Sequence, residues 1–380
     1  MSICTLDELD TPALLLDRAR LDANLARMRE QAARLGVRLR PHVKSTKCIE
    51  IARRALPDGG GITVSTLLEA EYFFEHGYRD LFYAVGIAPQ KLARVAALMA
   101  RGARLLLATD QVEAARRIEQ RGRELGLCFE VLIEIDCGDG RCGVAPHSDE
   151  LLAVAGALSG GARLAGVFTH GGHSYDGRSP EAHAAVAEQE RLAVVTAATR
   201  LRAAGHACDI VSLGSTPSVR HARDLAGVTE VRAGVYMVGD LFQCGVGSCA
   251  PDDLAISVLA TVIGQYPQRG EIIVDAGALA LSKDTSSMRF DDERNHGYGR
   301  VLMADGSAPP QALYVAHVSQ EHGVLRSRDG APDYARYPVG TRLRIEPNHA
   351  CMTASAYDRY HVLGDDGFGI EAQWPRISGW

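Results

Sequence analysis

Hydrophobic and polar positions between about residues 37 and 236 follow a pattern that predicts repeated strand–helix units. Short aliphatic and β-branched runs alternate with longer stretches whose apolar residues recur at helical spacing. The predicted strands cover residues 38–43, 61–66, 80–85, 104–108, 129–136, 164–170, 209–213 and 230–235. One apolar helix face is predicted before them, formed by Leu21, Leu25, Met28, Ala32 and Leu35. Eight strands with intervening helices predict a (β/α)8 barrel.

After Cys249 the pattern changes to β-branched runs separated by Gly, Pro and Asp turns, with little helical periodicity. The clearest runs cover residues 256–263, 271–275, 312–316 and 342–345. They predict a second, mostly β domain. The early run 12–17 precedes the first helix, so it can pair with this second sheet instead of joining the barrel. The predicted division is an α/β barrel over residues 18–245 and a β-rich domain formed by residues 1–17 and 246–380.

Composition narrows the class of protein. The 380 residues include 46% hydrophobic and 23% charged positions, as in an ordinary folded protein with two domains. The net charge of −6 gives no basic stripe, so we expect no nucleic-acid partner. We expect no membrane segment and no signal peptide, since no long apolar run occurs. Nine cysteines without regular spacing favour reduced thiols in the cytoplasm.

Lys44 is the first candidate for chemistry, because it follows the first predicted barrel strand. Active sites of such barrels are built at the carboxyl ends of the strands, so Lys44 is expected at the mouth. A second cation at Lys47 and partial desolvation would lower the pKa of Lys44 and favour attack on an aldehyde. An ordinary surface lysine would also fit this position.

Turns after the seventh and eighth strands suggest a phosphate site. Gly214 is followed by the hydroxyl residues Ser215 and Thr216, and Gly234 closes the eighth strand. Small residues expose backbone N–H groups, and barrels often bind phosphate at these two loops. Two ordinary glycine turns would be the alternative.

The loops after the fifth and sixth strands carry further polar candidates. Arg141 can reach a ring nitrogen or a carboxylate. Cys137 and Cys142 lie five apart without a second pair, which is weak evidence for a metal site. His170, His173 and Tyr175 are expected near the barrel mouth, as cofactor contacts or as packing residues.

His349 and Cys351 are the metal candidates of the second domain. On an extended chain, residues two apart point to the same side, as two ligands of one ion would require. Imidazole and thiolate favour zinc, although other divalent ions are possible. The same spacing also occurs by chance in structural positions.

Six segments together resemble one family. They are TPALLLD (11–17), RPHVKSTK (40–47), GITVST (61–66), GSTP (214–217), EVRAGVY (230–236) and PNHAC (347–351). In this order the chain resembles the D-serine dehydratase and D-threonine aldolase group of fold-type III, alanine-racemase-like pyridoxal-phosphate enzymes. The resemblance implies a pyridoxal-phosphate barrel, a C-terminal β domain and a homodimer, with Lys44 as the Schiff-base lysine.

The resemblance also implies roles for the other candidates. The cofactor phosphate is expected at Gly214, Ser215 and Thr216 and near Gly234. The further expected cofactor contacts are Arg141, His170, Tyr175 and Tyr236, with both Arg141 and Tyr175 fitting the ring nitrogen by position.

His349 and Cys351 match the metal pair of the dehydratase branch, whereas aldolases of the group carry an aspartate in place of the cysteine. The chain therefore resembles D-serine dehydratase and D-threo-3-hydroxyaspartate dehydratase most. No counterpart of the second catalytic tyrosine of racemases is found, which favours stereospecific chemistry.

The expected reaction begins when Lys44 removes the α-proton of a D-3-hydroxy amino acid. A metal-assisted loss of the 3-hydroxyl then leads to a 2-oxo acid and ammonia. Aldol cleavage at the same site is the first alternative. A non-catalytic pyridoxal-phosphate carrier is the second, although such carriers lack the C-terminal domain.

Overall fold

The computed structural model describes residues 4–380 and divides into two compact units. The barrel unit contains Arg27–Lys44, Ala52–Gly234 and the last two residues, and the β unit contains the residues up to Ala26 together with Ser45–Ile51 and Val235–Ser378. Residues 1–3 of the predicted segment 1–17 lie outside the described residues. No helix within residues 4–380 is long and apolar enough to cross a membrane.

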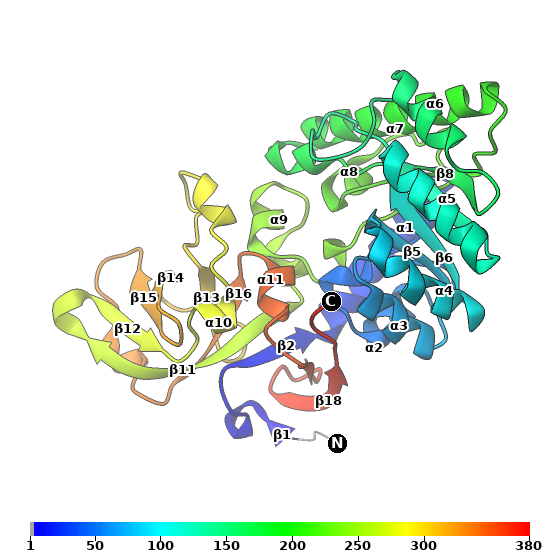
Figure 1. Ribbon diagram of the computed structural model, residues 1–380. Coiled ribbons are helices and arrows are strands. Elements are labelled where there is room, and N and C mark those ends of the chain that lie inside the picture. Colours follow the sequence, from blue (N-terminus) through cyan, green and yellow to red (C-terminus); the bar gives the residue numbers. More distant parts are fainter. Residues whose placement is uncertain (1–3) are drawn as a thin grey trace. The chain divides into compact units, whose positions relative to one another are not determined.

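The barrel unit is built on one parallel sheet of eight strands in the order β3-β10-β9-β8-β7-β6-β5-β4. Of these strands, β5, β6 and β8 are labelled in Figure 1. The strands are β3 Arg38–Leu39, β4 Ile62–Val64, β5 Asp80–Gly86, β6 Arg104–Thr109, β7 Phe129–Glu134, β8 Ala162–Phe168, β9 Ile210–Leu213 and β10 Glu230–Val231. All eight predicted strands are confirmed. The first and last are shorter than predicted because the chain soon enters the 3-10 helices η2 (Val43–Ser45) and η5 (Val235–Met237).

The edges of this sheet meet, as a barrel requires. His42, just after β3, forms an isolated parallel bridge with Thr63 of β4, and the N–H of Thr63 donates to the carbonyl of Pro41 (2.9 Å). Inside, the rings of Phe82 and Phe168 pack edge to face with centroids 5.0 Å apart. The predicted (β/α)8 fold is therefore confirmed.

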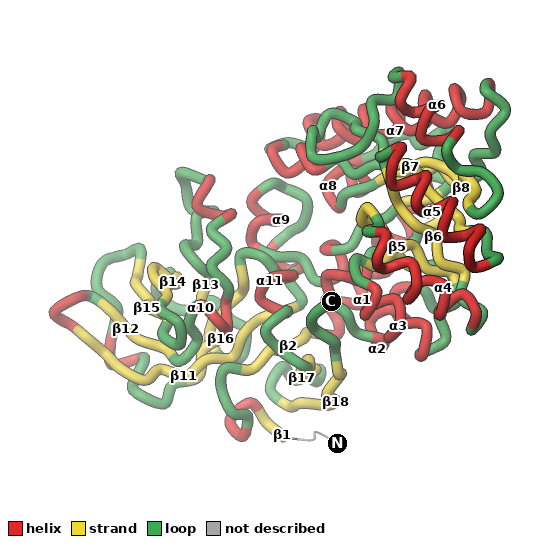
Figure 2. Tube along the Cα trace, viewed as in Figure 1, coloured by secondary structure: helices red, strands yellow, loops and turns green. Residues whose placement is uncertain are grey.

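Helices alternate with the barrel strands along the chain, as the red and yellow segments of Figure 2 show, and α3 to α7 pack on the sheet. Along the chain they are α1 Arg18–Arg34, α2 Ile49–Ala55, α3 Leu67–Glu75, α4 Leu92–Ala100, α5 Val112–Leu125, α6 Asp149–Gly156, α7 Pro180–Ala203 and α8 Thr216–His221.

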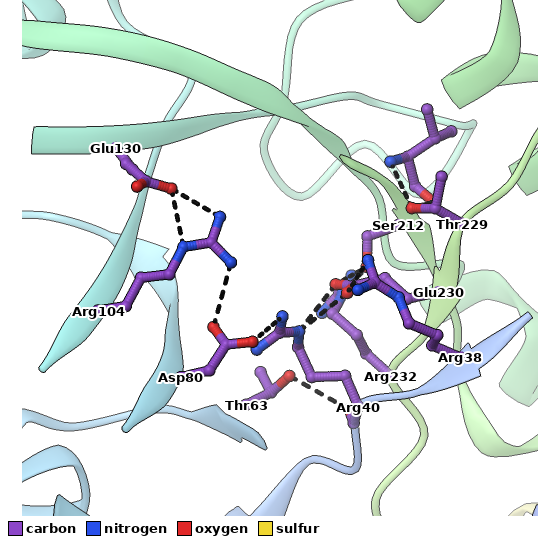
Figure 3. A network of polar contacts seen from close by, with 11 residues as sticks. Arg38, Arg40, Thr63, Asp80, Arg104, Glu130, Ser212, Thr229, Glu230 and Arg232 are labelled. Carbon is purple, nitrogen blue, oxygen red and sulfur yellow. Dashed lines mark hydrogen bonds and ion pairs between the residues drawn. The ribbon is translucent and has the colours of Figure 1, made fainter. Parts of the chain in front are cut away.

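A network of ion pairs connects the barrel strands (Figure 3). Arg40 is almost fully buried, and its Nε donates to both carboxylate oxygens of Glu230 at 3.0 Å. Its Nη2 reaches Asp80 on β5 at 2.9 Å. A Cβ at residue 61 would meet the Arg40 guanidinium at 2.1 Å, so Gly61 makes room for it. The network thus links strands on both sides of the β3–β4 closure.

The β unit contains one sheet of ten strands, in the order β1-β18-β17-β2-β11-β12-β15-β14-β13-β16. They are β1 Cys4–Thr5, β2 Ala13–Asp17, β11 Ile256–Tyr266, β12 Glu271–Val274, β13 Gly299–Met303, β14 Leu313–Val318, β15 Gly323–Ser327, β16 Arg342–Pro347, β17 Arg359–Leu363 and β18 Gly369–Pro375. Because β16 also pairs with β11, six of these strands close on themselves. The helices of the β unit are α9 Leu241–Gly245, α10 Ala278–Leu281 and α11 Ala350–Ala354.

The N-terminal strand β2 joins the sheet of the β unit. It pairs antiparallel with β11 and parallel with β17, and it has no partner among the barrel strands. Leu14, Leu15 and Leu16 are fully buried there. The interpretation of residues 12–17 as a strand of the second domain is therefore correct, and the predicted second domain is mostly β.

Candidate active site

Lys44 lies in η2, directly after the barrel's first strand. The N–H of His42 donates to the carbonyl of Ala233 (2.9 Å), which fixes this part of the chain beside the last strand. Lys44 is exposed, whereas its neighbour Val43 is completely buried. The amine therefore projects from a backbone that packing holds in place, at the carboxyl end of β3 as predicted.

Two histidines share the surroundings of Lys44. Burial and the charges of Lys44 and Arg232 lower the pKa of His42 far below its ordinary value. Burial also lowers the pKa of His170 to about 3, against the hydrogen bond to Gly214 and with Lys44 adding to the shift. The Nδ1 of His170 lies 3.1 Å from the Gly214 carbonyl oxygen. Both rings are therefore neutral near pH 7, and His170 contacts the predicted phosphate turn while it senses the charge of Lys44.

The predicted phosphate turn requires a glycine. Gly214 has φ +135°, and a Cβ there would meet the side chain of Val219 at 2.8 Å. The Ser215 hydroxyl caps α8 by accepting from the N–H of Ser218 (3.2 Å), and Thr216 is buried at the first position of this helix. These contacts hold the turn in one conformation.

Glu190 on α7 supports this turn, and the sequence pattern did not mark it. Its Oε1 accepts from the N–H of Gly171 at 2.6 Å. Burial raises the pKa of Glu190 to about 6, although hydrogen bonds from Ser218 and from the backbone of Gly171 and Gly214 oppose the shift. One buried carboxyl thus connects the loops that follow β8 and β9. A single glutamate on a long helix carries no local sign of this role.

The remaining cofactor candidates differ in their surroundings. Arg141 is about half exposed and pairs with Glu134 at 3.3 Å. The Tyr175 ring lies 6.3 Å from that of His170. Gly234, in the barrel unit, and Tyr236, in the β unit, are both buried.

Arg232, which the sequence pattern did not mark as a candidate, lies inside the barrel beside Phe82 and Phe168. Its Nε donates to the Ser212 hydroxyl at 2.9 Å, and its guanidinium lies 5.0 Å from the Phe168 ring centre. Burial lowers its pKa to about 10, against the attraction of Glu230. Arg232 therefore brings positive charge to the interior beneath His42 and His170.

The cysteines after the fifth strand do not form a metal pair. The Cys142 thiol faces Glu134 (3.6 Å), and burial raises the pKa of Cys137 to about 11. The Nε2 of His173 lies 2.9 Å from the Oε1 of Gln189, so its ring is held by a side-chain hydrogen bond. Within residues 4–380, no group of three or more His, Cys, Asp or Glu side chains is arranged to hold a metal.

His349 and Cys351 are brought together, but not in the predicted way. The sequence suggested an extended chain with both side chains on one side. Instead His349 is the N-cap of α11, and Cys351 lies in its first turn. The predicted extended chain is therefore wrong, because the chain turns into a helix directly after β16. Hydrogen bonding still joins the two side chains.

Two residues that the sequence did not mark hold this pair. Asp284 Oδ2 lies 3.1 Å from His349 Nδ1, and the Cys351 thiol donates to the Ser45 hydroxyl at 3.3 Å. Burial opposes charge on His349, but the bonds to Asp284 and Cys351 raise its pKa to about 11. Burial likewise opposes ionisation of Cys351, but His349 lowers its pKa. The pair thus favours a positive charge beside a thiolate.

These donors fit a divalent metal. Asp284 on Nδ1 leaves Nε2 of His349 for an ion, an arrangement that commonly orients metal-binding imidazoles. Imidazole and thiolate suit zinc, and two protein ligands leave positions open for water or substrate.

The surroundings of Lys44 fit pyridoxal phosphate. An exposed amine can attach an aldehyde, and the strained Gly214 turn presents backbone to a phosphate. In the described part of the chain, the buried Nδ1 of His42 has no hydrogen-bond partner, which a bound group could supply.

Comparison with known proteins agrees with this arrangement. Residues 16–241 match the family described as alanine racemase, N-terminal domain, and residues 255–363 match the putative serine dehydratase domain. The chain therefore belongs to the family of proteins with the alanine racemase N-terminal domain. The resemblance to fold-type III pyridoxal-phosphate enzymes of the D-serine dehydratase and D-threonine aldolase group is thereby confirmed.

Several relatives match over almost the whole chain. D-threo-3-hydroxyaspartate dehydratase of Delftia sp. (strain HT23) is 47% identical over 382 residues, covering 99% of both chains, and its solved structure has a TM-score of 0.95 over 99% of this chain and 100% of that one. D-serine dehydratase of Dictyostelium discoideum is 32% identical over 381 residues, covering 95% of both chains. D-threonine aldolase of Arthrobacter sp. is 32% identical over 370 residues, covering 95% of this chain and 90% of the other.

Two further solved structures bear on the metal. One is a cysteine-to-alanine variant of D-threo-3-hydroxyaspartate dehydratase in a metal-free form, and the other is a histidine-to-alanine variant. The two substituted residues lie two positions apart.

Proposed function

We propose that the protein is a pyridoxal-phosphate- and metal-dependent dehydratase that converts a D-3-hydroxy amino acid to a 2-oxo acid and ammonia. The observation that carries the proposal is the His349–Cys351 donor pair with Asp284 behind it. A histidine and a cysteine at the same spacing are the residues substituted in the dehydratase variants, one of which is metal-free.

Lys44 is the proposed attachment site and proton carrier. When bound, pyridoxal phosphate supplies an electron sink for charge at the substrate α-carbon, and the metal supplies a Lewis acid for the departing hydroxide. Lys44 accepts the α-proton, for which an exposed amine beside neutral His42 and His170 is suited. Because the pKa values of both histidines are lowered, the two rings are weak bases and do not compete with Lys44 for the α-proton.

The other cofactor contacts are proposed from position. Gly214, Ser215, Thr216 and Gly234 hold the phosphate, with Glu190 keeping the turn in shape. Arg141 and Tyr175 are the proposed partners of the ring nitrogen, and Tyr236 is a further contact.

His349 and Cys351 are the proposed metal ligands, and zinc is the proposed ion. The thiolate and imidazole favour zinc over harder ions such as magnesium. Lys44 and the proposed metal ligand Cys351 are linked along the chain by one residue. Ser45 follows Lys44 directly, and its hydroxyl accepts the hydrogen bond from the Cys351 thiol.

We propose D-threo-3-hydroxyaspartate as the first substrate and D-serine as the second. The relative with 47% identity is a D-threo-3-hydroxyaspartate dehydratase, and the D-serine dehydratase of Dictyostelium is more distant at 32%. A homodimer is proposed from the family resemblance. The nine unpaired cysteines are consistent with a reducing, cytoplasmic location.

A panel of D-3-hydroxy amino acids tests the proposal. Purified enzyme loaded with cofactor and zinc is given D-threo-3-hydroxyaspartate, D-serine or D-threonine, and the keto acid, ammonia, glycine and aldehyde are measured together. We expect keto acid and ammonia in equal amounts. Chelation and Cys351→Ala should both abolish them while pyridoxal phosphate stays bound. Glycine and an aldehyde as the main products would instead identify an aldolase, like the relative from Arthrobacter.

A further inference from the structure

A pair of thiols lies in the β unit, with Cys244 in α9 and Cys249 in the turn that follows this helix. The sulfur atoms of Cys244 and Cys249 are 3.3 Å apart, and both side chains are partly exposed. A disulfide has a sulfur–sulfur distance of about 2.05 Å, so each sulfur needs to move by only about 0.6 Å. The intervening Gly247 has open space around it and can absorb this movement.

Residues 240–249, which include both thiols, form two hydrogen bonds with residues 348–350, beside the proposed metal ligands. The N–H of Ala350, between the two proposed ligands, donates to Asp240 Oδ2 at 3.1 Å. The N–H of Phe242 donates to the carbonyl of Asn348 at 3.2 Å. Figure 1 labels the two helices involved, α9 and α11.

Further hydrogen bonds within residues 240–249 connect the two thiols to Asp240. The other carboxylate oxygen of Asp240 caps α9 by accepting from the N–H of Gln243 at 2.8 Å. The N–H of Cys244 donates to the Asp240 carbonyl (3.0 Å), and the Cys249 thiol faces the same carbonyl at 3.9 Å. A change in the distance between the two sulfurs therefore acts on Asp240 directly.

We propose that Cys244 and Cys249 form a reversible disulfide with small-molecule disulfide oxidants such as oxidised glutathione, and that this bond weakens metal binding at His349 and Cys351. The first part is independent of the proposed function, and the second part rests on it. Transient disulfides of this kind are the usual ones in reducing compartments.

The reaction is a balanced thiol–disulfide exchange. The hydrogen bond with Cys249 and burial raise the pKa of Cys244, which disfavours Cys244 as the attacking thiol, so the first attack is assigned to Cys249. It bonds to one sulfur of the oxidant and releases one glutathione thiolate, which takes up a proton. Cys244 then loses its proton and attacks Cys249, releasing the second glutathione. The protein loses two electrons, and one oxidised glutathione becomes two thiols.

Oxidation of the holoenzyme tests the first part. Enzyme loaded with cofactor and zinc is incubated with oxidised glutathione, remaining thiols are alkylated, and peptides are mapped by mass spectrometry. We expect a cross-link between Cys244 and Cys249 that dithiothreitol removes. Alkylation of both residues under conditions that oxidise other cysteines would overturn the proposal.

Zinc affinity, measured by competition with a chromogenic chelator, tests the second part. We expect a loss of about tenfold on oxidation, the size typical of disturbed outer contacts at metal sites, and recovery on reduction. Cys244→Ser and Cys249→Ser should keep their zinc under the same treatment, whereas Cys208→Ser, a buried control, should respond like the wild type. Equal loss in Cys244→Ser would assign the effect to another thiol and overturn this part. If the proposed metal site does not bind zinc at all, the reduced enzyme will already lack zinc affinity. That result is separate from the cross-link, so the two failures can be distinguished.

Discussion

Lys44 and Lys47 show how position separates two similar side chains. Both follow the first barrel strand within a few residues, and both could be proposed from the sequence as attachment sites. The structure places Lys44 next to His42 and His170, whose pKa values it lowers by its charge. Lys47 lies in the other unit, where its carbonyl accepts from the N–H of Ile377.

The first prediction is that Lys44→Ala abolishes cofactor attachment and lowers turnover by about a thousandfold or more, because it removes both the amine that holds the cofactor and the general base. The measurement is borohydride reduction followed by peptide mapping, together with keto acid formation. Lys47→Ala is the matched control and should retain the covalent adduct. An adduct found on Lys47 in the wild type would reject the assignment.

The second prediction concerns Asp284, which lies 3.1 Å from His349. Asp284→Asn should lower zinc affinity by about ten- to a hundredfold, because the ring loses the carboxylate that orients it. Zinc affinity is measured by chelator competition, and pyridoxal-phosphate content should not change. Asp291→Asn, at an exposed position of the same loop region, should leave both unaltered. Unchanged zinc affinity in Asp284→Asn would mean that Asp284 does not support the metal ligand His349.

At the scale of elements, the turn between β9 and α8 depends on one glycine. The third prediction is that Gly214→Val raises the dissociation constant for pyridoxal phosphate by about tenfold or more, since the new side chain meets Val219 and strains the backbone at φ +135°. Cofactor titration by absorbance measures this constant. Gly205→Val, at φ +86° with open space, controls for strain alone.

Ser215→Ala is a milder test of the same turn, useful if Gly214→Val fails to fold. It removes the cap of α8, so the cofactor should bind more weakly while the barrel remains folded. Normal cofactor affinity in both variants would move the phosphate site elsewhere.

The helix α7 provides the fourth prediction, through Glu190. Its pKa of about 6 lies above the ordinary value of 4.5, so the folded protein binds more protons than the unfolded chain between these pH values. The free energy of unfolding therefore falls as the pH rises through this window, by about 2 kcal/mol in total.

Urea unfolding of the wild type and of Glu190→Gln from pH 4.5 to 7.5 measures this effect. The glutamine side chain cannot titrate. The free energy of unfolding of the variant, relative to that of the wild type, should therefore increase as the pH rises. Glu181→Gln, an exposed position on the same helix, should follow the wild type. Parallel pH curves for wild type and Glu190→Gln would contradict the assignment.

At the scale of the whole molecule, the sheet of the β unit joins distant parts of the chain. Strand β2 pairs with β11 and β17, so residues near the start of the chain lie beside segments more than two hundred positions away. Besides the two-residue β1, four strands of this sheet, β13, β15, β17 and β18, were not predicted from the sequence. They contain charged residues such as Arg300, Arg326 and Arg359, which interrupt the apolar pattern that indicates a strand.

The sequence by itself determined the barrel and the chemistry of single residues. Buried parallel strands and amphipathic helices leave local, periodic patterns, and a lysine after the first strand can be placed at the barrel mouth because every parallel strand ends on the same side. The choice of His349 and Cys351 rested on their donor atoms, their spacing and the family resemblance, although the helix that carries them was missed.

Only the tertiary structure decided which side chains support these residues. Asp284 and His349 are 65 positions apart, and Glu190 and Gly171 are 19 apart. The pairing of Cys351 with Ser45 joins residues 306 positions apart. None of these contacts follows a helical or strand period, since they arise when separate strands and loops meet on closure of the sheets. A sequence pattern reports neighbours along one element, whereas orientation and pKa depend on neighbours in space.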